Sequence, residues 1–188
     1  MSLSEKPYVI VVGIDYSELS RLALLQAFQT ATERTPSEVH VLHVRADEHG
    51  YPHAEHAESA PKDEALVRAL ERLQHLVRTD LALFLETGQR AGLRPFGLVS
   101  HIRSGSAARE IAQLANDLQA NLVVVGTQGR TGIARLLLGS VAHAVVTLAP
   151  CAVLVARDRS FALSVPARGR PGDLDGTETR VQVGSEGN

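Results

Sequence analysis

Apolar residues in this chain gather in short runs, which alternate with longer stretches where apolar positions recur at helical spacing. Four of the runs are rich in β-branched residues and carry little charge, as is typical of strands buried on both faces of a parallel sheet. They span residues 8–14, 38–44, 121–126 and 151–156. A weaker fifth run lies within residues 93–103, where Pro95 and Gly97 favour a place at the edge of the sheet.

The stretches between the runs predict four helices, over about residues 18–34, 62–87, 107–118 and 141–148. Ser17 is a favourable N-cap for the first of them, and Pro150 follows the last. Five strands that alternate with four helices predict an α/β fold, with a doubly wound, Rossmann-like parallel sheet and helices on both faces. Ligands of such sheets bind at the carboxyl ends of the strands, where the strand order reverses.

The 188 residues suffice for one folded domain, which we expect to span residues 1–157. Residues 158–188 have balanced charge and little apolar periodicity, so we expect a disordered tail there. A net charge of −2 gives no basis for binding nucleic acid or an anionic membrane, and no run of 18 apolar residues predicts a membrane span. With one cysteine and no signal-peptide pattern at the N-terminus, the sequence predicts a cytoplasmic protein.

Glycines follow the fourth strand with a spacing, G-x2-G-x9-G-S, that indicates phosphate binding. Gly126 and Gly129 let the backbone turn and approach a ligand closely, and Gly139 with Ser140 opens the last helix. The free amides and dipole of a helix N-terminus favour an anion. Ser140 adds a hydroxyl donor, and Arg130 offers a positive charge nearby. One glycine alone serves packing as often as binding, so the indication comes from their joint place between a strand and a helix.

Asp15 ends the first predicted strand, at the edge of the sheet where ligands bind. A carboxylate there can accept a hydrogen bond from a ribose hydroxyl or hold a metal ion through water. An equally good interpretation is that Asp15 only caps the helix that follows, and for Ser17 this capping role is the better one.

Taken together, these residues resemble the universal stress protein family over about residues 6–157. The resemblance rests on VGIDYS at 12–17, HVLHV at 40–44, GTQGR at 126–130 with LGSV at 138–141, and PCAVLV at 150–155. Within that family the G-x2-G-x9-G-S/T pattern marks the ATP-binding branch. The resemblance therefore implies the sheet order 3-2-1-4-5, a homodimer, and an ATP-binding regulatory protein of the stress response.

The resemblance also implies where an adenine nucleotide binds, whether ATP, ADP or AMP, with or without Mg²⁺. It places the adenine near Ile14, Asp15 and Val44. It places the ribose and phosphates near Val125, Gly126, Gly129, Gly139, Ser140 and Val141. Arg130 joins this set for its charge, and Gly13 stands where relatives often carry another small residue or proline, so it shapes the adenine pocket.

A slow ATPase of the adenine nucleotide α-hydrolase-like class is the main alternative to a regulatory module. Hydrolysis needs an oriented water, and Gln128 is the one side chain beside the glycines with an obvious means of orienting it. We therefore expect no catalytic residue and at most slow hydrolysis. A phospho-receiver domain is excluded, because the third strand ends at residues 101–104 without an acid. A hydride-transfer enzyme is disfavoured, because no G-x-G-x-x-G follows the first strand.

Histidines and acids at residues 47–58 suggest a metal cluster, but their spacing fits no standard zinc pattern, so we expect a solvated loop and no metal. His40 and His43 lie three apart on one strand and are predicted to face opposite sides of the sheet. Neither is expected to act as a base. Cys151 is expected to be a small buried apolar residue.

The last predicted strand, residues 151–156, has neither charge nor proline, and the family's strand order places it at a sheet edge. An apolar edge strand must be covered, and pairing with the same strand of a second copy around a two-fold axis achieves this. The alternative is that the residues after Arg157 fold back over this edge. The sequence identifies no other protein partner.

Overall fold

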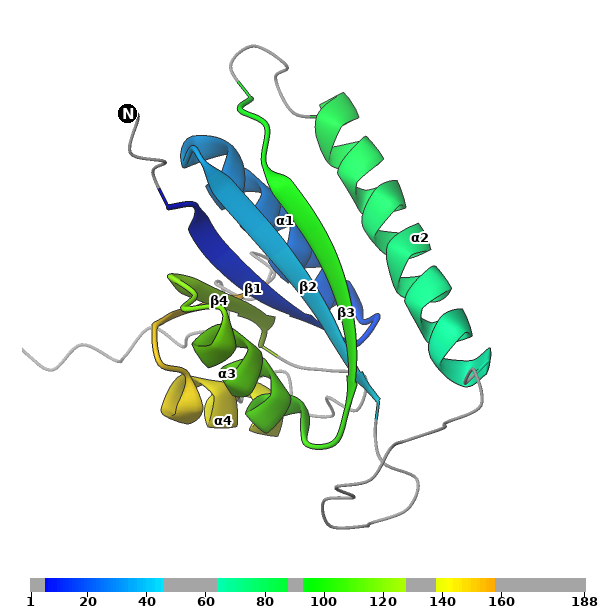
Figure 1. Cartoon of the computed structure of the whole chain (residues 1–188), viewed down its shortest axis with the longest axis vertical. Coiled ribbons are helices and arrows are strands. Elements are labelled where there is room, and N and C mark those ends of the chain that lie inside the picture. The colour runs from blue at the N-terminus through cyan, green and yellow to red at the C-terminus, as the bar shows by residue number, and fades with distance from the viewer. Residues whose placement is uncertain (1–5, 46–63, 88–92, 128–137, 158–188) are drawn as a thin grey trace, which may run out of the picture.

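The structure is a computed structural model that describes residues 6–45, 64–87, 93–127 and 138–157. In chain order its elements are β1 (Tyr8–Ile14), α1 (Glu18–Glu33), β2 (Ser37–Arg45), α2 (Glu64–Thr87), β3 (Gly97–Ser104), α3 (Ala107–Asp117), β4 (Leu122–Gly126), α4 (Ser140–Leu148) and β5 (Ala152–Ala156) (Figure 1). Every predicted strand and helix is present. The predicted tail and the histidine-bearing loop lie outside the described residues.

The five strands form one parallel sheet in the order β3-β2-β1-β4-β5, which confirms the predicted fold class and strand order. β1 is central, and its residues from Tyr8 to Ile14 pair with residues 37–43 of β2. β3 is an edge strand, as its proline and glycine predicted. The order reverses between β1 and β4, so the carboxyl ends of these two strands flank the point where ligands of this architecture bind.

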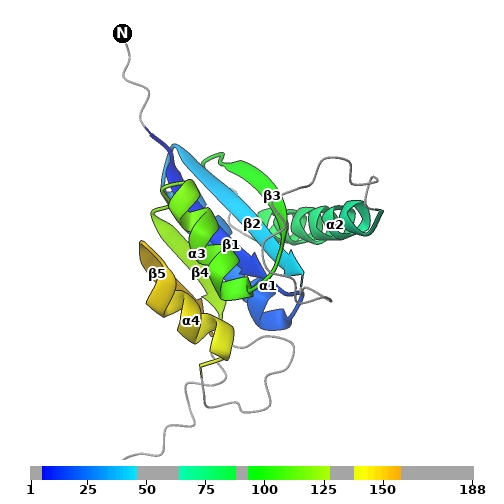
Figure 2. The same ribbon diagram turned by 60° about the horizontal axis from the view of Figure 1, so that its bottom comes forward.

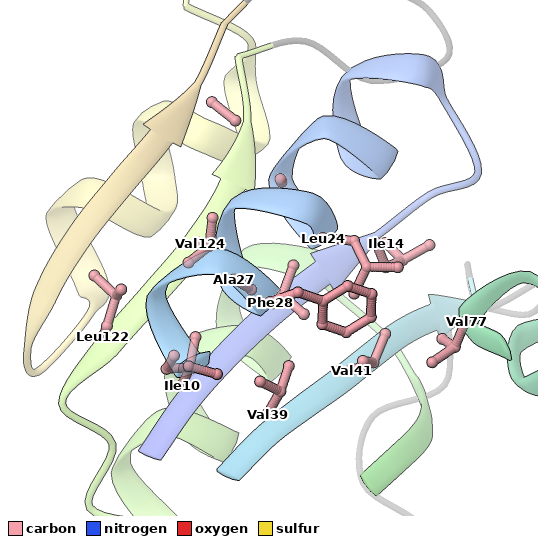
Figure 3. Packing of buried hydrophobic residues seen from close by; sticks show 14 of the residues in the cluster. Ile10, Ile14, Leu24, Ala27, Phe28, Val39, Val41, Val77, Leu122 and Val124 are labelled. Atoms are coloured by element: carbon pink, nitrogen blue, oxygen red, sulfur yellow. The ribbon is translucent and has the colours of Figure 1, made fainter. Parts of the chain in front are cut away.

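Helices cover both faces of the sheet, with α1 and α2 on one face and α3 and α4 on the other (Figure 2). Under α1, the ring of Phe28 packs among the aliphatic side chains of β1 and β2, including Val39 and Val41 (Figure 3). Under α3 and α4, a second cluster contains Val11, Leu42 and Val123. Because the central strands are buried on both sides, they read in the sequence as continuous apolar runs.

α2 is buried along only part of its apolar side. Leu73 and Val77 are buried, whereas Leu66 is exposed. α2 packs mainly against α1 and the edge strand β3, so it has less of the sheet to cover than α1 has. No helix in the described ranges has both the length and the apolar character needed to cross a membrane.

Candidate functional site

The candidate site lies at the carboxyl edge of the sheet, where β1 passes into α1 and where β4 ends near the start of α4. Parallel strands bring all their carboxyl ends to one edge, so Asp15 after β1 and Thr127 after β4 are placed there by topology alone. The N-termini of α1 and α4 point their unpaired amides toward the same edge.

Asp15 and Ser17 form a hydrogen-bonded turn that begins α1. Asp15 Oδ1 accepts hydrogen bonds from the Ser17 amide at 3.0 Å and from Ser17 Oγ at 2.6 Å. Ser17 Oγ in turn accepts from the Ser20 amide at 3.2 Å, as an N-cap does. The capping role predicted for Ser17 is therefore observed. Asp15 takes part in it, and this fixes the direction of its carboxylate at the edge of the sheet.

Tyr16, between these two residues, has a φ of 67°, in the left-handed region that most side chains avoid. Its ring packs beside the His43 ring, with centroids 4.6 Å apart, and the Arg72 guanidinium lies 4.4 Å from the ring centre. His43 Nδ1 lies 2.7 Å from the carbonyl oxygen of Ile14 and donates to it. Contacts from β2 and α2 thus hold the turn that presents Asp15.

Burial raises the pKa of Tyr16 above its ordinary value, and the positive charge of Arg72 partly offsets this. The Tyr16 hydroxyl is buried and has no hydrogen-bond partner among the described residues. No pattern in the sequence predicted this cluster. The D-x-S pattern indicates that Tyr16 lies in a turn. Nothing in the sequence indicates that Arg72, fifty-six positions later, lies over its ring.

On the phosphate side, the backbone joins the two ends of the glycine segment. The Gly139 amide donates to the Thr127 carbonyl oxygen at 2.7 Å, and the Thr127 amide donates to Ala156 at 3.0 Å. Gly126 and Gly139, thirteen positions apart in the sequence, therefore both lie at the carboxyl edge of the sheet. Gly129 and Arg130, the middle of that motif, lie outside the described residues.

The N-terminus of α4 has the chemistry of an anion site. Gly139 is its N-cap and has no side chain to bond to the first-turn amides, so those of Ser140, Val141 and Ala142 have no partner within the helix. Ser140 and Val141 are exposed. These amides and the Ser140 hydroxyl are the donors that would hold phosphate oxygens, so the residues present fit a nucleotide phosphate.

Two of the predicted glycines have packing reasons of their own. A Cβ on Gly13 would lie 2.7 Å from Cδ1 of Ile111 on α3, and a Cβ on Gly126 would lie 2.8 Å from the backbone carbonyl carbon of Leu19 on α1. Gly126 therefore lets the start of α1 approach β4 closely. The contact with Ile111 favours a small residue at position 13, whether or not an adenine binds nearby.

The remaining residues predicted to contact the nucleotide, Ile14, Val44 and Val125, differ in how far their side chains are buried. The side chains of Ile14 and Val125 are buried, on opposite faces of the sheet, so either residue can meet a ligand only through its backbone. Val44, at the end of β2, is partly buried on the α3 face. In the described part of the chain, no three metal-ligating side chains converge to form a metal site, so none is assigned to Mg²⁺.

The two histidines of β2 face opposite sides, as predicted: His40 contacts His101 of β3, and His43 contacts Tyr16. Cys151 is only partly buried, and burial raises the pKa of its thiol. Its exposure exceeds the prediction because it precedes the edge strand β5, which has a neighbouring strand on one side only.

Comparisons with known proteins agree with this architecture. The profile of the universal stress protein family matches residues 8–157. Universal stress protein YxiE of Bacillus subtilis is 28% identical over 156 residues, covering 79% of this chain and 97% of YxiE. Universal stress protein MJ0531 of Methanocaldococcus jannaschii is 49% identical over 53 residues, which are 28% of this chain and 31% of that relative.

Two solved structures with the same fold were determined with adenine nucleotides. A universal stress protein in complex with cAMP is 20% identical, with a TM-score of 0.54, over 79% of this chain and 96% of its own. The universal stress protein from Archaeoglobus fulgidus in complex with dAMP is 21% identical, with a TM-score of 0.51, over 81% of this chain and 98% of its own.

Proposed function

Because the chain belongs to the universal stress protein family, we propose that it is a regulatory protein of the stress response that binds an adenine nucleotide, foremost ATP. The bound nucleotides of two solved relatives, cAMP and dAMP, share an adenine base and at least one phosphate. Both support an adenine nucleotide as the ligand class. The choice of ATP rests on the G-x2-G-x9-G-S spacing of the sequence.

One observation carries this proposal: the hydrogen bond between the Gly139 amide and the Thr127 carbonyl oxygen. It brings the end of β4 and the start of α4 together beside the turn of Asp15. In our proposal the first-turn amides of α4 and the Ser140 hydroxyl hold the phosphates. The turn at Asp15 supplies a fixed carboxylate for the nucleoside.

Hydrolysis of the nucleotide stays an alternative to a purely regulatory role. Thr127, Gly139 and Ser140 form the described phosphate side, and they can position and neutralise phosphate oxygens but carry no carboxylate to orient a water. Gln128 lies outside the described residues. A phosphate-release assay distinguishes the two functions, and we expect turnover far below the ordinary enzyme range of about 1–1,000 per second.

We also propose that the protein is a homodimer that pairs through β5. β5 is a sheet edge, with Ala152 exposed and Val153 to Val155 only partly buried. α4 lies beside β5 (Figure 2), and Val146 and Leu148 of this helix are each about half exposed. An edge strand beside a helix with exposed apolar side chains is a surface that a second copy would cover. A cytoplasmic location stays a prediction from the sequence.

Replacement of Gly139 by valine tests the phosphate site. Gly139 has a φ of −60° and a ψ of 152°, which valine adopts without strain, so Gly139→Val should fold. Its branched side chain would occupy the approach to the α4 amides, so we expect calorimetry to show at least a tenfold loss of ATP affinity. Gly129→Val is expected to act alike.

The matched control is Gly97→Ala, at the amino end of β3, where a Cβ would meet only the flexible Glu38 side chain. This variant should bind ATP as the wild type does. Undiminished ATP affinity in Gly139→Val and Gly129→Val would overturn the assignment of the site.

A further inference from the structure

A pair of histidines on the α3 face of the sheet has no part in the proposed function. His40 of β2 and His101 of the edge strand β3 meet with His40 Nδ1 2.9 Å from His101 Nε2. Their rings are stacked, with centroids 5.2 Å apart and planes inclined by 26°. His40 is only 6% exposed, and His101 is partly buried. The contact therefore joins two neighbouring strands through two titratable rings that are largely removed from water.

The hydrogen bond between the rings limits how many protons the pair can hold. A neutral imidazole has one N–H and one lone pair, so one ring donates to the other. Glu38 Oε2 lies 3.4 Å from His40 Nε2, which favours the tautomer with the His40 proton on Nε2 and with Nδ1 accepting from His101. If one proton is added to His101, its Nε2–H still donates to the unprotonated Nδ1 of His40, and the hydrogen bond is kept. With two added protons, both facing nitrogens carry hydrogen and the bond cannot form.

The charges around the pair act unequally on the two rings. Glu38, on β2, lies beside His40. Arg103, on β3, lies on the side of His101, and its guanidinium is paired with Glu110 and Asp117 of α3. On this face β1 contributes only apolar side chains. Burial lowers the pKa of His101 below its ordinary value, and the nearby His40 and Arg103 lower it further.

We propose that the hydrogen bond between His40 and His101 holds the edge strand β3 to β2 in a proton-sensitive way. The bond forms while only one of the two facing nitrogens carries a hydrogen, and it breaks when both rings are protonated. Among the described residues β3 pairs only with β2, so it can separate from the sheet without disturbing another strand. The chain continues from β3 into α3, and the Gly105 amide between them donates to the Arg45 carbonyl oxygen at the end of β2. Opening of the pair would therefore reach α3 as well.

The direction of the pH effect follows from the lowered pKa of His101. A histidine in the unfolded chain titrates near pH 6.5. Above that pH the His101 ring is neutral in both the folded and the unfolded chain, so the hydrogen bond makes its full contribution to stability. As the pH falls below about 6.5 toward the lower pKa of His101 in the folded chain, His101 binds a proton in the unfolded chain but stays neutral in the folded chain. The ratio of folded to unfolded protein then falls by up to tenfold per pH unit for this one proton.

The test compares the pH dependence of unfolding in the full chain and two variants between pH 7.5 and 5. His101→Gln retains an amide that can hydrogen bond to His40 but cannot titrate. His75→Gln removes an exposed histidine of α2 and is the matched control. We expect the wild type and His75→Gln to lose stability alike on acidification, and His101→Gln to lose less, by up to tenfold per pH unit in the equilibrium constant.

Ring resonances of the wild type provide a second readout that needs neither a variant nor a nucleotide. We expect His101 to titrate below the ordinary pH of a histidine, with backbone amides of β3 exchanging faster once both rings are protonated, after correction for the intrinsic rate. An unaltered slope in His101→Gln would overturn the proposal, and so would a wild-type His101 that titrates at the ordinary pH of a histidine. If His101→Gln does not fold, the wild-type titration alone decides.

Discussion

Glycines at the carboxyl edge of this sheet illustrate what one residue can and cannot reveal in a sequence. The motif spacing placed Gly126 at the end of a strand and Gly139 at the start of the next helix, and the bond from the Gly139 amide to Thr127 brings these two ends to the same edge. It did not predict that Gly126 also makes room for the backbone of Leu19, or Gly13 for Ile111. Those neighbours come from distant parts of the chain. The spacing of glycines in a motif therefore indicates where in the fold they lie. It does not indicate which neighbouring atoms leave no room for a side chain there.

Tyr16 combines a strained backbone with a well-packed ring, and two substitutions separate these effects. Tyr16→Gly and Tyr16→Ala both remove the contacts with His43 and Arg72. Only glycine adopts the φ of 67° without strain. We expect Tyr16→Gly to be the more stable of the two by about 1 kcal/mol in denaturant unfolding, despite glycine's larger loss of entropy on folding.

Equal stability of the two variants would show that the turn at residue 16 relaxes out of the left-handed region in solution. Both variants should be less stable than the wild type, because each loses a ring contacted by an aromatic neighbour and a cation.

At the scale of elements, the helices were predicted well in extent but less well in what they bury. In α1 the buried set includes Ala23, Leu24 and Ala27, whereas Leu22 and Leu25 are only partly buried. In α2 nothing in the sequence indicates that Asp80 is buried, at 2% exposure, against α1. The apolar period predicts which side of a helix faces inward. It cannot show a charged residue whose partner, Arg21, lies on another helix.

The Arg21–Asp80 pair predicts an unequal response to its two truncations. Arg21 Nε donates to Asp80 Oδ2 at 3.0 Å, and the arginine side chain is largely accessible to water whereas the carboxylate is not. Arg21→Ala leaves a buried carboxylate without its cation and should cost about 3 kcal/mol of unfolding free energy. Asp80→Ala leaves an arginine that can turn to solvent and should cost less.

Denaturant unfolding of both variants at neutral pH measures this difference. Arg68→Ala, which breaks an exposed pair with Glu64 on the same helix, is the control and should change stability by less than about 0.5 kcal/mol. A larger cost for Asp80→Ala than for Arg21→Ala would contradict the asymmetry.

At the scale of the whole molecule, the alternation of runs predicted a parallel doubly wound sheet, because each crossover between parallel strands needs a helix. The strand order came from the family resemblance and not from the alternation, which fits several orders. The fold determines which edge of the sheet carries the proposed site, and so the places of Asp15 and Gly126 could be predicted from the sequence. The cluster at Tyr16 could not, since its contacts depend on how α2 packs.

The proposed homodimer makes a prediction for the exposed start of β5. Ala152→Lys places a charge on this edge without removing a core side chain, so we expect a folded monomer by light scattering where the wild type is a dimer. Leu154→Lys is a less clean probe, because Leu154 also packs against the cluster under α1. Val67→Lys, at an exposed apolar residue of α2, is the control and should stay dimeric.

Deletion of residues 159–188 tests the alternative covering of the same edge. The shortened chain should remain dimeric if β5 pairs with β5. A wild-type monomer at micromolar concentration, or a dimer that is lost only when these residues are deleted, would contradict the proposed interface.

The central claim is that an adenine nucleotide binds at the carboxyl edge, between the turn of Asp15 and the start of α4. A titration of the isotope-labelled chain with ATP, followed by amide resonances, tests binding and place together. We expect saturable shifts at Asp15, Thr127, Ser140 and Val141, with amides at the opposite edge, such as Ser37 and Gly97, unmoved. No saturable shift, or shifts confined to residues away from this edge, would contradict it.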